Sequence, residues 1–473
     1  MKSFRLGLAA VVVLLCAGCM VGPDYFKPSV PMTAAYKEDQ GWKLAQPRDQ
    51  IPRGKWWEIF GDPQLNALEE QVSEANQNVK VAEARFRQAR ALIGFARAGL
   101  FPTVSAGVSA SSLRDSTNRA YPPSSKASTQ DFLLTGDVSY ELDLWGRIRR
   151  SVTAAREEAQ ASAADLETAR LSLQAELAFD YFELRSADAQ QRLLNDTVKA
   201  FEEALQLTTR RFEGGVAAKS DVVQARTQLE TTQVQATDIA VQRAQFEHAI
   251  AILIGKPPAA FSLPPAPLDL QPPDIPVGVP SELLERRPDI AAAERRVAEA
   301  NEQIGIAKAA FFPTVTLNAL LGFESSSINK WMGWQSFLWA VGSSLAQTIF
   351  DGGRRRATSE AALASYDATV ASYRQATLDA FQQVEDNLAA LRILEREAEQ
   401  QQRAVASARE SLQLFTNRYK GGVDTYLQVI TAQTAALANE RNQVDILRRR
   451  MDASVLLVKA LGGGWNVADL PQL

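Results

Sequence analysis

Two periods of hydrophobic and polar residues divide the chain into two kinds of segment. Side chains alternate one by one at about 102–112 and 132–144, for example in "DVSYELDL" at 137–144. A weaker alternation follows at about 313–324 and 336–350. Period-two alternation is typical of β-strands with one apolar and one polar face, so these segments predict four strands in two pairs.

The other segments carry hydrophobic residues at helical spacing. Residues 147–213 contain neither proline nor glycine, and their large apolar side chains recur at steps of three, four and seven, as in a coiled coil. Residues 354–420 form a second such stretch of 67 residues. At about 1.5 Å per residue, each predicts a helical rod of about 100 Å. Shorter helices are predicted at about 65–99, 218–255, 281–310 and 424–461.

Each long helix is expected to end at a glycine pair, because glycine readily takes the left-handed conformation that closes a helix. The pairs are Gly214–Gly215 and Gly421–Gly422. A new helix should follow each pair, with Ser220 or Asp221 and Asp424 as candidate N-caps. The pattern therefore predicts two long antiparallel helical hairpins, each with a glycine turn at its tip.

The two halves of the chain repeat one another at a lag near 207 residues. "RRFEGGV" at 210–216 matches "NRYKGGV" at 417–423, and "LFPTVSA" at 100–106 matches "FFPTVTL" at 311–317. The same parts recur in the same order, which indicates an internal duplication. The predicted domains are a signal peptide at 1–18, a lipidated extended segment at 19–62, repeat 1 at 63–256, a proline-rich linker at 257–280, repeat 2 at 281–462 and a C-terminal tail at 463–473.

The linker has nine prolines in residues 257–280, so it cannot be helical and should run extended as a semi-rigid connector. A disordered spacer is the alternative. Phe261, Leu263, Leu268 and Ile275 interleave the prolines, which favours a linker packed against the body.

The first eighteen residues have the features of a bacterial signal peptide: Lys2 and Arg5, then an apolar run, then small residues. Ala17 and Gly18 directly precede Cys19, as in a lipoprotein cleavage box, although Cys16 stands where such boxes usually have leucine. Cleavage would leave Cys19 as an acylated N-terminus anchored in a membrane leaflet. By similarity to such lipoproteins, the Met20 that follows favours the outer membrane. A plain secretory signal is the alternative.

Composition narrows the class of protein. The chain is 46% hydrophobic and 22% charged, as expected of a folded polypeptide. No cysteine follows Cys19, so a disulfide framework is excluded. Loss of Lys2 and Arg5 with the signal changes the formal charge from −4 to −6, which gives no reason to expect nucleic acid as a partner. No later uncharged apolar run approaches the roughly 18 residues of a membrane helix, so any membrane crossing would use strands.

Polar loops should join the strands of each pair, at 113–131 and 325–334. Trp331 and Trp334 in the second loop suit a membrane interface, although a soluble half-buried hairpin has the same pattern. Four strands cannot close a membrane barrel, because an open edge in lipid leaves backbone groups without partners. Two copies would give eight strands and a filled interior, whereas three would give twelve strands and room for a lumen. The expected fold is therefore an α+β membrane protein: a homotrimer with a 12-stranded β-barrel, four strands per chain, continuous with a long α-helical barrel.

Several motifs together resemble the outer membrane factor (TolC-like) family, in the lipoprotein branch (OprM/NodT-like) that supplies the outer-membrane channels of tripartite efflux pumps. The similarity covers almost the whole mature chain. It implies a trimer in the outer membrane with an α-barrel in the periplasm, an inner-membrane pump often of the RND type, and a periplasmic adaptor that docks on the helical tips. The motifs are "CMVGPDYFKP" (19–28), "KWWEIFGDPQL" (55–65), the two "FPTV" segments, "LWGRIRR" (144–150), "LLERRPDI" (283–290), "FDGGRRR" (350–356) and "RYKGGVDTYLQV" (418–429).

The resemblance also implies that the helical tips close the periplasmic aperture. Leu427 matches the apolar position of the family's constriction, and Thr431 stands where the family usually has an acidic residue. Asp424 could supply carboxylates nearby, while Arg418 and Tyr419, with Lys420, could make the pairings that hold the tips shut; the alternative is a solvated, purely structural role. The tips expected to contact the adaptor are Gly214, Gly215, Val216, Gly421, Gly422 and Val423.

The sequence argues against an enzyme. The single histidine, His248, lies within a predicted helix, and no GxxxxGK[ST] phosphate loop occurs, so the energy for transport must come from a partner. No cofactor is expected apart from the covalent lipid on Cys19. Two alternatives to an efflux duct remain: a duct for type I protein secretion, and a structural coiled-coil lipoprotein without a pore. The sequence does not identify a substrate.

Overall fold

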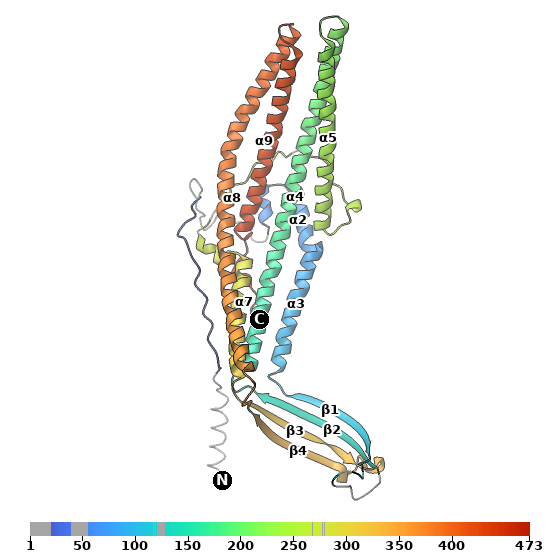
Figure 1. The fold of residues 1–473 in the computed structure, drawn as a ribbon, viewed down its shortest axis with the longest axis vertical. Coiled ribbons are helices and arrows are strands. Elements are labelled where there is room, and N and C mark those ends of the chain that lie inside the picture. The colour runs from blue at the N-terminus through green and yellow to red at the C-terminus, as the bar shows by residue number, and fades with distance from the viewer. Residues whose placement is uncertain are drawn as a thin grey trace.

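The structure is a computed structural model that describes residues 20–38, 55–116, 118, 120, 128–266, 268–276, 278 and 280–473. The molecule is elongated: two helical hairpins extend side by side to one end, and a four-stranded sheet leaves the other end at an angle (Figure 1). Cys19 and the signal peptide lie outside the described residues.

The sheet is antiparallel, in the order β1-β2-β3-β4. The register pairs Val104 with Val138 between β1 and β2, and Tyr140 with Leu317 between β2 and β3. The β2–β3 pairing joins the strand pairs of the two repeats, so β1 and β4 form the open edges in a single chain. The strands run Thr103–Leu113 (β1), Thr129–Leu142 (β2), Thr314–Ser325 (β3) and Phe337–Ala346 (β4).

Aromatic side chains gather at the end of the sheet far from the helices. Trp334 stacks on Phe337 with ring centres 5.2 Å apart, and Trp331 lies 5.8 Å from the ring of Phe132. The Trp331 indole donates a hydrogen bond of 3.1 Å to the carbonyl oxygen of Phe323. The loop between β3 and β4 is therefore fixed to the sheet by its aromatic residues.

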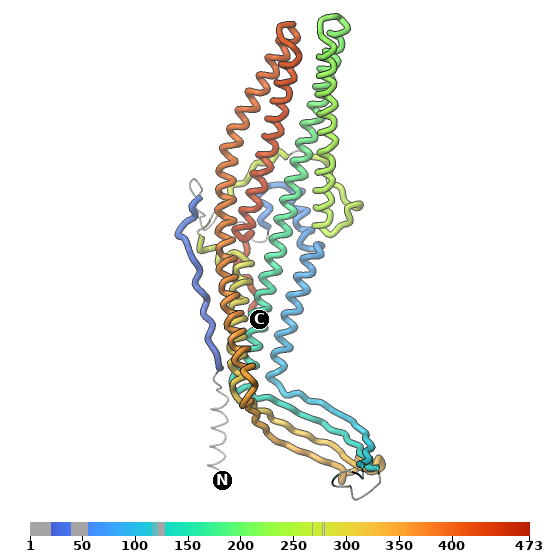
Figure 2. Tube along the Cα trace, viewed as in Figure 1, coloured from blue at the N-terminus to red at the C-terminus, as the bar shows by residue number. Residues whose placement is uncertain are grey.

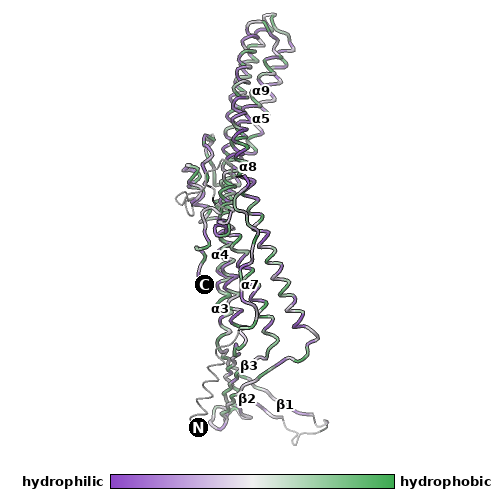
Figure 3. Tube along the Cα trace, turned by 90° about the vertical axis from the view of Figure 1, so that its left-hand side faces the viewer, coloured by the Kyte–Doolittle hydropathy of each residue, from purple (hydrophilic) through white to green (hydrophobic). Residues whose placement is uncertain are grey.

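Two helices of 67 residues, α4 (Arg147–Glu213) and α8 (Arg354–Lys420), run almost the length of the helical part. Each starts after a glycine with positive φ, Gly146 at 78° and Gly353 at 90°, where the chain turns out of the sheet. Helices α5 (Lys219–Leu253) and α9 (Tyr426–Ala460) return along α4 and α8. Hydrophobic and hydrophilic residues alternate along all four helices (Figure 3). In the described part of the chain, no helix combines the length and apolarity needed to cross a membrane.

The expected single helix at 65–99 is wrong, because the chain breaks at Asn76 into α2 (Pro63–Ala75) and α3 (Gln77–Ala98). The Asn76 side chain accepts hydrogen bonds from Asn78 N and Val79 N, which makes it the N-cap of α3. Its amide also donates to the carbonyl oxygen of Leu253, 2.8 Å away at the end of α5. The break therefore holds the first helices of repeat 1 against the end of its hairpin.

The expected helix at 281–310 is interrupted as well. A short helix, α6 (Leu283–Arg286), is followed by extended Arg287 and then by α7 (Pro288–Ala309). The residue before a proline is pushed out of the helical region, which explains the break at Arg287. The last strand is also shorter than expected, ending at Ala346 instead of about residue 350. Short 3-10 turns lie at Trp56–Phe60, Pro258–Ala260, Pro280–Glu282, Ile328–Lys330, Trp334–Ser336 and Val467–Asp469.

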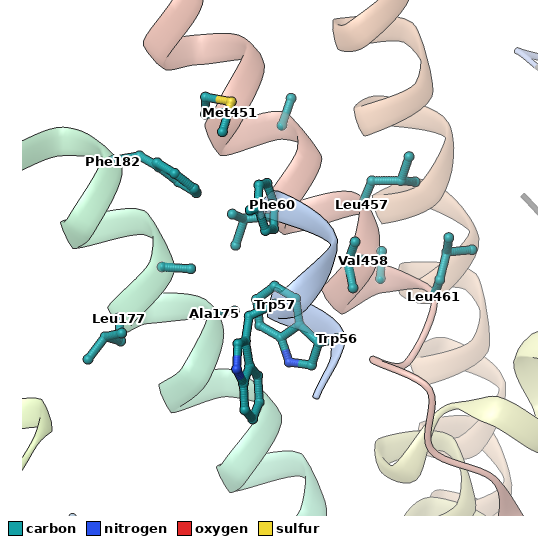
Figure 4. Close-up of a cluster of buried hydrophobic side chains, with 14 of the residues drawn as sticks. Trp56, Trp57, Phe60, Ala175, Leu177, Phe182, Met451, Leu457, Val458 and Leu461 are labelled. Atoms are coloured by element: carbon teal, nitrogen blue, oxygen red, sulfur yellow. The ribbon is translucent and has the colours of Figure 1, made fainter. Parts of the chain in front are cut away.

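The main core lies at the middle of the molecule, where the N-terminal turn, both long helices and the end of α9 meet (Figure 4). Trp56, Trp57 and Phe60 insert between α4 and α9, and the Phe60 ring lies 5.1 Å from that of Phe182. Burial of such large aromatic side chains gives this core much of its stability. The linker joins the same core through Leu263, Leu268 and Ile275, which are all buried.

The duplication relates α3 to α7, α4 to α8 and α5 to α9. Within the chain, α4 packs against α7 of the following repeat. The equivalent partners α8 and α3 lie on opposite flanks of the molecule (Figure 1). The α4–α7 contact therefore has no counterpart between α8 and α3 within the described part of one chain.

Candidate functional site at the helical tips

The two tips are built from the same turn. The amide of Val216 donates to the carbonyl oxygen of Arg211 at 2.8 Å, and that of Val423 donates to Arg418 at 2.9 Å. Gly215 and Gly422 donate to the carbonyl oxygens three residues before them, at 2.9 and 3.0 Å. This pair of bonds is a Schellman motif, which satisfies the free carbonyl groups at a helix end.

Glycine is required at one position of each tip. Gly215 has φ of 73° and Gly422 has φ of 76°, in the left-handed region that side chains disfavour. Gly214 and Gly421 have φ of −81° and −76°, so their backbone would accept other residues. Val216 and Val423 follow directly and project their side chains into solvent.

Asp424 does not cap a helix, contrary to the sequence expectation. Helix α9 starts after Thr425, and α5 starts after Ala218, with no side-chain cap bond at either start among the described residues. Asp424 instead accepts two hydrogen bonds from Arg418, from Nε at 2.5 Å and from Nη2 at 3.2 Å. These bonds lower the pKa of the Asp424 carboxyl, so the ion pair spans the second tip from α8 to the start of α9.

Tyr419 lies beneath this ion pair, buried against Tyr426 with ring centres 5.2 Å apart. The two rings form a small core with residues of both hairpins, so the tips are packed together below their turns. Burial raises the pKa of Tyr426 to about 12, which keeps its hydroxyl protonated. The other members of this core are Leu205, Ala225, Leu412, Val429 and Ile430.

Arg211 joins the first tip to the second. Its Nη1 atom donates to the carbonyl oxygens of Tyr419 at 2.9 Å and Lys420 at 3.1 Å, and its guanidinium carbon lies 4.6 Å from the centre of the Tyr419 ring. These carbonyl groups belong to the last turn of α8, where the helix dipole is negative and favours a cation. The sequence reasoning did not single out Arg211, although it stands in the repeated "RRFEGGV".

The duplication shows why Arg211 is available for this contact. At the lag of 207 residues, Arg211 is equivalent to Arg418, and Asp424 is equivalent to Ala217. Arg418 is held within its own tip by Asp424, whereas the first tip has an alanine in place of that carboxylate. Arg211 therefore reaches the neighbouring hairpin.

Leu427 and Thr431 lie one helical turn apart on an exposed face of α9. The side chain of Leu427 is 53% exposed, which is unusual for a leucine so close to a packed core. The Thr431 hydroxyl donates a hydrogen bond to the Leu427 carbonyl oxygen at 2.9 Å. Because threonine is uncharged, this position adds no charge to the exposed face of α9. The structure thus brings Arg418, Tyr419 and Asp424 together and leaves Leu427 and Thr431 free of that cluster.

The described residues show no arrangement suited to catalysis at the tips. They contain no group of three or more histidine, cysteine, aspartate or glutamate residues able to hold a metal ion. His248, the single histidine of the chain, is exposed on α5. The tips are instead a surface of turns, one ion pair and one bridge between hairpins.

A sheet with two open edges, continuous with long helical hairpins that end in packed tips, defines a duct-forming subunit rather than a closed globular domain. Comparison with known proteins identifies the kind of duct. Residues 68–256 and 279–463 match the family described as "Outer membrane efflux protein". The two matched ranges correspond to the two repeats.

Individual relatives agree with this match. The chain is 32% identical to the probable efflux pump outer membrane protein TtgC of Pseudomonas putida, over 96% of this chain and 95% of that protein. It is 34% identical to the pyoverdine export outer membrane protein OpmQ of Pseudomonas aeruginosa, over 96% of each chain. Its structure is similar to the outer-membrane channel OprN with a TM-score of 0.87 and 32% identity, over 94% of this chain and 100% of that chain.

The chain belongs to the outer membrane efflux protein family. It is an outer-membrane exit duct for efflux, extending into the periplasm, and its family is one of channels rather than of enzymes.

Proposed function

We propose that three copies of this chain close into one continuous duct, with the sheet in the outer membrane and the helical tips in the periplasm. The observation that carries this proposal is the pair of open strand edges, β1 and β4, on a sheet joined directly to the helical hairpins. Backbone groups at a strand edge cannot stay without partners in lipid. The next copy is the natural partner for each edge.

The internal duplication supplies the geometry of that contact. Inside the chain, β2 pairs with β3 and α4 packs on α7. The equivalent contacts between copies would pair β4 with the next chain's β1 and pack α8 on the next chain's α3. Apolar side chains are already exposed on both flanks, as this packing needs: Val81, Leu92 and Phe95 on α3, and Leu363, Leu378 and Ile393 on α8.

The number of copies follows from the size of the interior. Two chains would give an eight-stranded barrel whose interior side chains fill it, whereas three give twelve strands and a lumen. Three chains also bring six helical hairpins into a ring below the membrane. The duct is passive, so its driving force comes from a partner in the inner membrane.

The tips form the resting closure of this duct. Arg211 ties the two hairpins of one chain together, and the Arg418–Asp424 ion pair stiffens the second tip. With the tips held in this way, Leu427 of each chain would contribute to an apolar ring, with Thr431 one helical turn further from the tip. A hydrophobic constriction of this kind blocks ions by excluding water.

The glycine turns, with Val216 and Val423 exposed beside them, form the surface on which a periplasmic adaptor docks. Relatives such as TtgC are outer-membrane proteins of efflux pumps, and by that similarity the further partner is an inner-membrane pump. The resemblance to the outer membrane factor family favours a pump of the RND type. Acylation of Cys19 would add a lipid anchor to the barrel.

Planar-bilayer conductance of the purified trimer tests the duct and its closure together. We expect small conductance from the wild type and a several-fold increase from Leu427→Ala. Leu456→Ala is the matched control, because Leu456 is also an exposed leucine of α9 but lies far from the tip. Verified trimers that show no conductance in any of the three proteins would refute the duct. Equal conductance of the wild type, Leu427→Ala and Leu456→Ala would refute only the role of Leu427 in closing it.

A further inference from the structure

The first described residues of the chain are held at the junction between the sheet and the long helices. From there, residues 20–38 follow the outer side of the helical part (Figure 2). The amide of Val21 donates to the carbonyl oxygen of Trp145 at 3.1 Å. The carbonyl oxygen of Val21 accepts from Nε of Arg150 at 2.7 Å. Both backbone groups of Val21 are therefore bound, one by the segment that connects β2 to α4 and the other by the first turn of α4.

Arg150 is the centre of this contact. Its side chain is only 1% exposed, and its Nη1 atom pairs with Glu302 Oε2 at 2.8 Å. A buried arginine is stable only when its charge and its donors have partners. Here the partners come from three parts of the chain: α4 carries Arg150, α7 carries Glu302, and the N-terminal segment supplies the Val21 carbonyl group.

Two glycines make room for this arrangement. A Cβ atom on Gly305 would lie 2.3 Å from Cδ and Nε of Arg150. A Cβ atom on Gly22 would lie 2.5 Å from Cα of Gly305, and Gly22 has φ of 117°. The N-terminal segment thus crosses α7 where both segments have a glycine and no side chain separates them.

Neighbouring residues extend the contact on both sides. Asn301 Nδ2 donates to the Pro23 carbonyl oxygen at 3.2 Å, and the Tyr25 hydroxyl donates to Glu294. Burial raises the pKa of Tyr25, which keeps this donor protonated. On the other side, Met20 covers Gly146, where an added Cβ atom would lie 2.6 Å from Met20 Cγ.

Among the described residues, this arrangement is found in the first repeat and not at the equivalent place in the second. At the lag of 207 residues, the position equivalent to Arg150 is Ala357. Gly94 is equivalent to Gly305 at the lag of 211 residues that relates 100–106 to 311–317, and among the described residues no other part of the chain comes within 4 Å of its added Cβ. The buried arginine is therefore specific to the place where the N-terminal segment binds.

We propose that Arg150, Glu302, Asn301 and Gly305 form a binding seat for residues 20–25, which fixes the start of the mature chain at the sheet–helix junction of its own subunit. Consecutive Cα atoms are about 3.8 Å apart, so an anchor attached to the residue before Met20 begins beside the membrane end of the duct. The seat thereby sets where the lipid enters the membrane relative to the sheet. This last step rests on the proposed acylation of Cys19, whereas the seat itself does not.

Spin-label distances in the full-length trimer test the seat. Asp24→Cys and Glu176→Cys place two labels on exposed residues of the N-terminal segment and α4, away from the flank of α8 proposed to contact the next copy. Trimers are diluted with unlabelled chains, so that only distances within one chain are measured. We expect one narrow distance distribution, which broadens at least two-fold when Gly22→Ala is added. Phe26→Ala is the matched control and should leave the distribution narrow, because its side chain is 79% exposed.

Gly305→Ala obstructs the seat from the α7 side and should broaden the distribution like Gly22→Ala. A broad distribution in intact wild-type trimers, or an unchanged width in both glycine variants, would overturn the seat. The number of labels per chain reports separately on the anchor. A third label would show that the Cys19 thiol is free, which would refute the acylation and leave the result on the seat standing.

Discussion

The guanidinium of Arg211 lies 4.6 Å from the centre of the Tyr419 ring and donates to the carbonyl oxygen of the same residue at 2.9 Å. This contact joins the two hairpins of one chain at their tips. The equivalent arginine, Arg418, bonds Asp424 within its own tip. The two repeats differ at this point, with Ala217 in the first and Asp424 in the second, and this difference accompanies a bridge between hairpins in one and a local ion pair in the other.

Removing the bridge should loosen the closure. Arg211→Ala deletes one cation–π contact and two hydrogen bonds to carbonyl groups, together worth about 1–2 kcal/mol per chain. We expect conductance in planar bilayers to rise by about an order of magnitude, since 1.4 kcal/mol corresponds to a factor of about ten. Arg210→Ala removes the same charge from an exposed neighbour and serves as the control. Equal conductance from the two variants would show that only net charge at the tip matters.

The local ion pair gives a different prediction. Arg418→Asp and Asp424→Arg should each raise conductance, because each places two like charges at the second tip. Combining them restores an ion pair in the reverse order and should bring conductance back toward the wild type. A double variant that conducts as much as the sum of the single variants would show that the pair does not hold the tip.

The pH dependence of the same pair follows from the direction of its pKa shift. Arg418 lowers the pKa of Asp424, so the contribution of the pair is present at neutral pH and is lost only as the pH falls through that lowered value. Wild-type conductance should therefore be the same at pH 7.5 and pH 5. A rise in conductance between these values would point to another titrating group.

Local sequence pattern was enough to predict the long helices, including their ends, but not the breaks within two of the shorter ones. The stretches without proline and glycine coincide with α4 and α8, because nothing within 67 residues interrupts the backbone hydrogen bonds. The break at Asn76 was missed, since asparagine in a helical pattern is compatible with a continuous helix. In the structure its side chain caps α3 through Asn78 N and Val79 N, and its amide is held by the carbonyl oxygen of Leu253, a partner 177 residues away in sequence.

At the helical tips, too, the sequence predicted the backbone turns better than the side-chain contacts. The duplication located both glycine turns, since left-handed backbone restricts the choice of residue. Asp424 was expected to cap a helix, because an aspartate before a helix usually does so. The nearby guanidinium of Arg418 competes for the carboxylate and binds it. The contact that Arg211 makes with Tyr419, 208 residues further along the chain, depends on how the two hairpins pack. The alanine at position 217, where the second repeat has Asp424, is the one sequence signal that the Arg211 charge has no partner within its own tip.

The glycine pair at the first tip offers a test with an internal control. Gly215→Ala forces a side chain into the left-handed region and should cost about 1 kcal/mol or more, whereas Gly214→Ala should be tolerated because its φ is negative. Limited proteolysis of the trimer should show faster cleavage at residues 213–218 in Gly215→Ala alone. Equal cleavage of both variants would mean that the turn does not depend on the backbone of Gly215.

The buried carboxyl group of Glu69 leads to the last prediction. Glu69 is fully buried in α2, and neither of its carboxyl oxygens has a hydrogen-bond partner among the described residues. Burial raises its pKa well above the usual range. A carboxyl whose pKa is raised by folding stabilises the folded state least at high pH, because ionisation then favours the unfolded chain. Each unit by which the pKa is raised corresponds to about 1.4 kcal/mol lost once the pH exceeds both values.

Glu69→Gln removes the titration and keeps the shape of the side chain. The wild type should therefore lose thermal stability between pH 4 and pH 8 relative to Glu69→Gln, with the two curves closest at pH 4. Glu74→Gln, on the exposed side of the same helix, should follow the wild type at every pH. Parallel curves for the wild type and Glu69→Gln would show that the folded protein gives Glu69 a partner or water that keeps its pKa ordinary. The test is how the difference in thermal midpoint between the wild type and Glu69→Gln changes with pH, not its size at any one pH. A buried amide without partners also costs free energy, but this cost is the same at each pH.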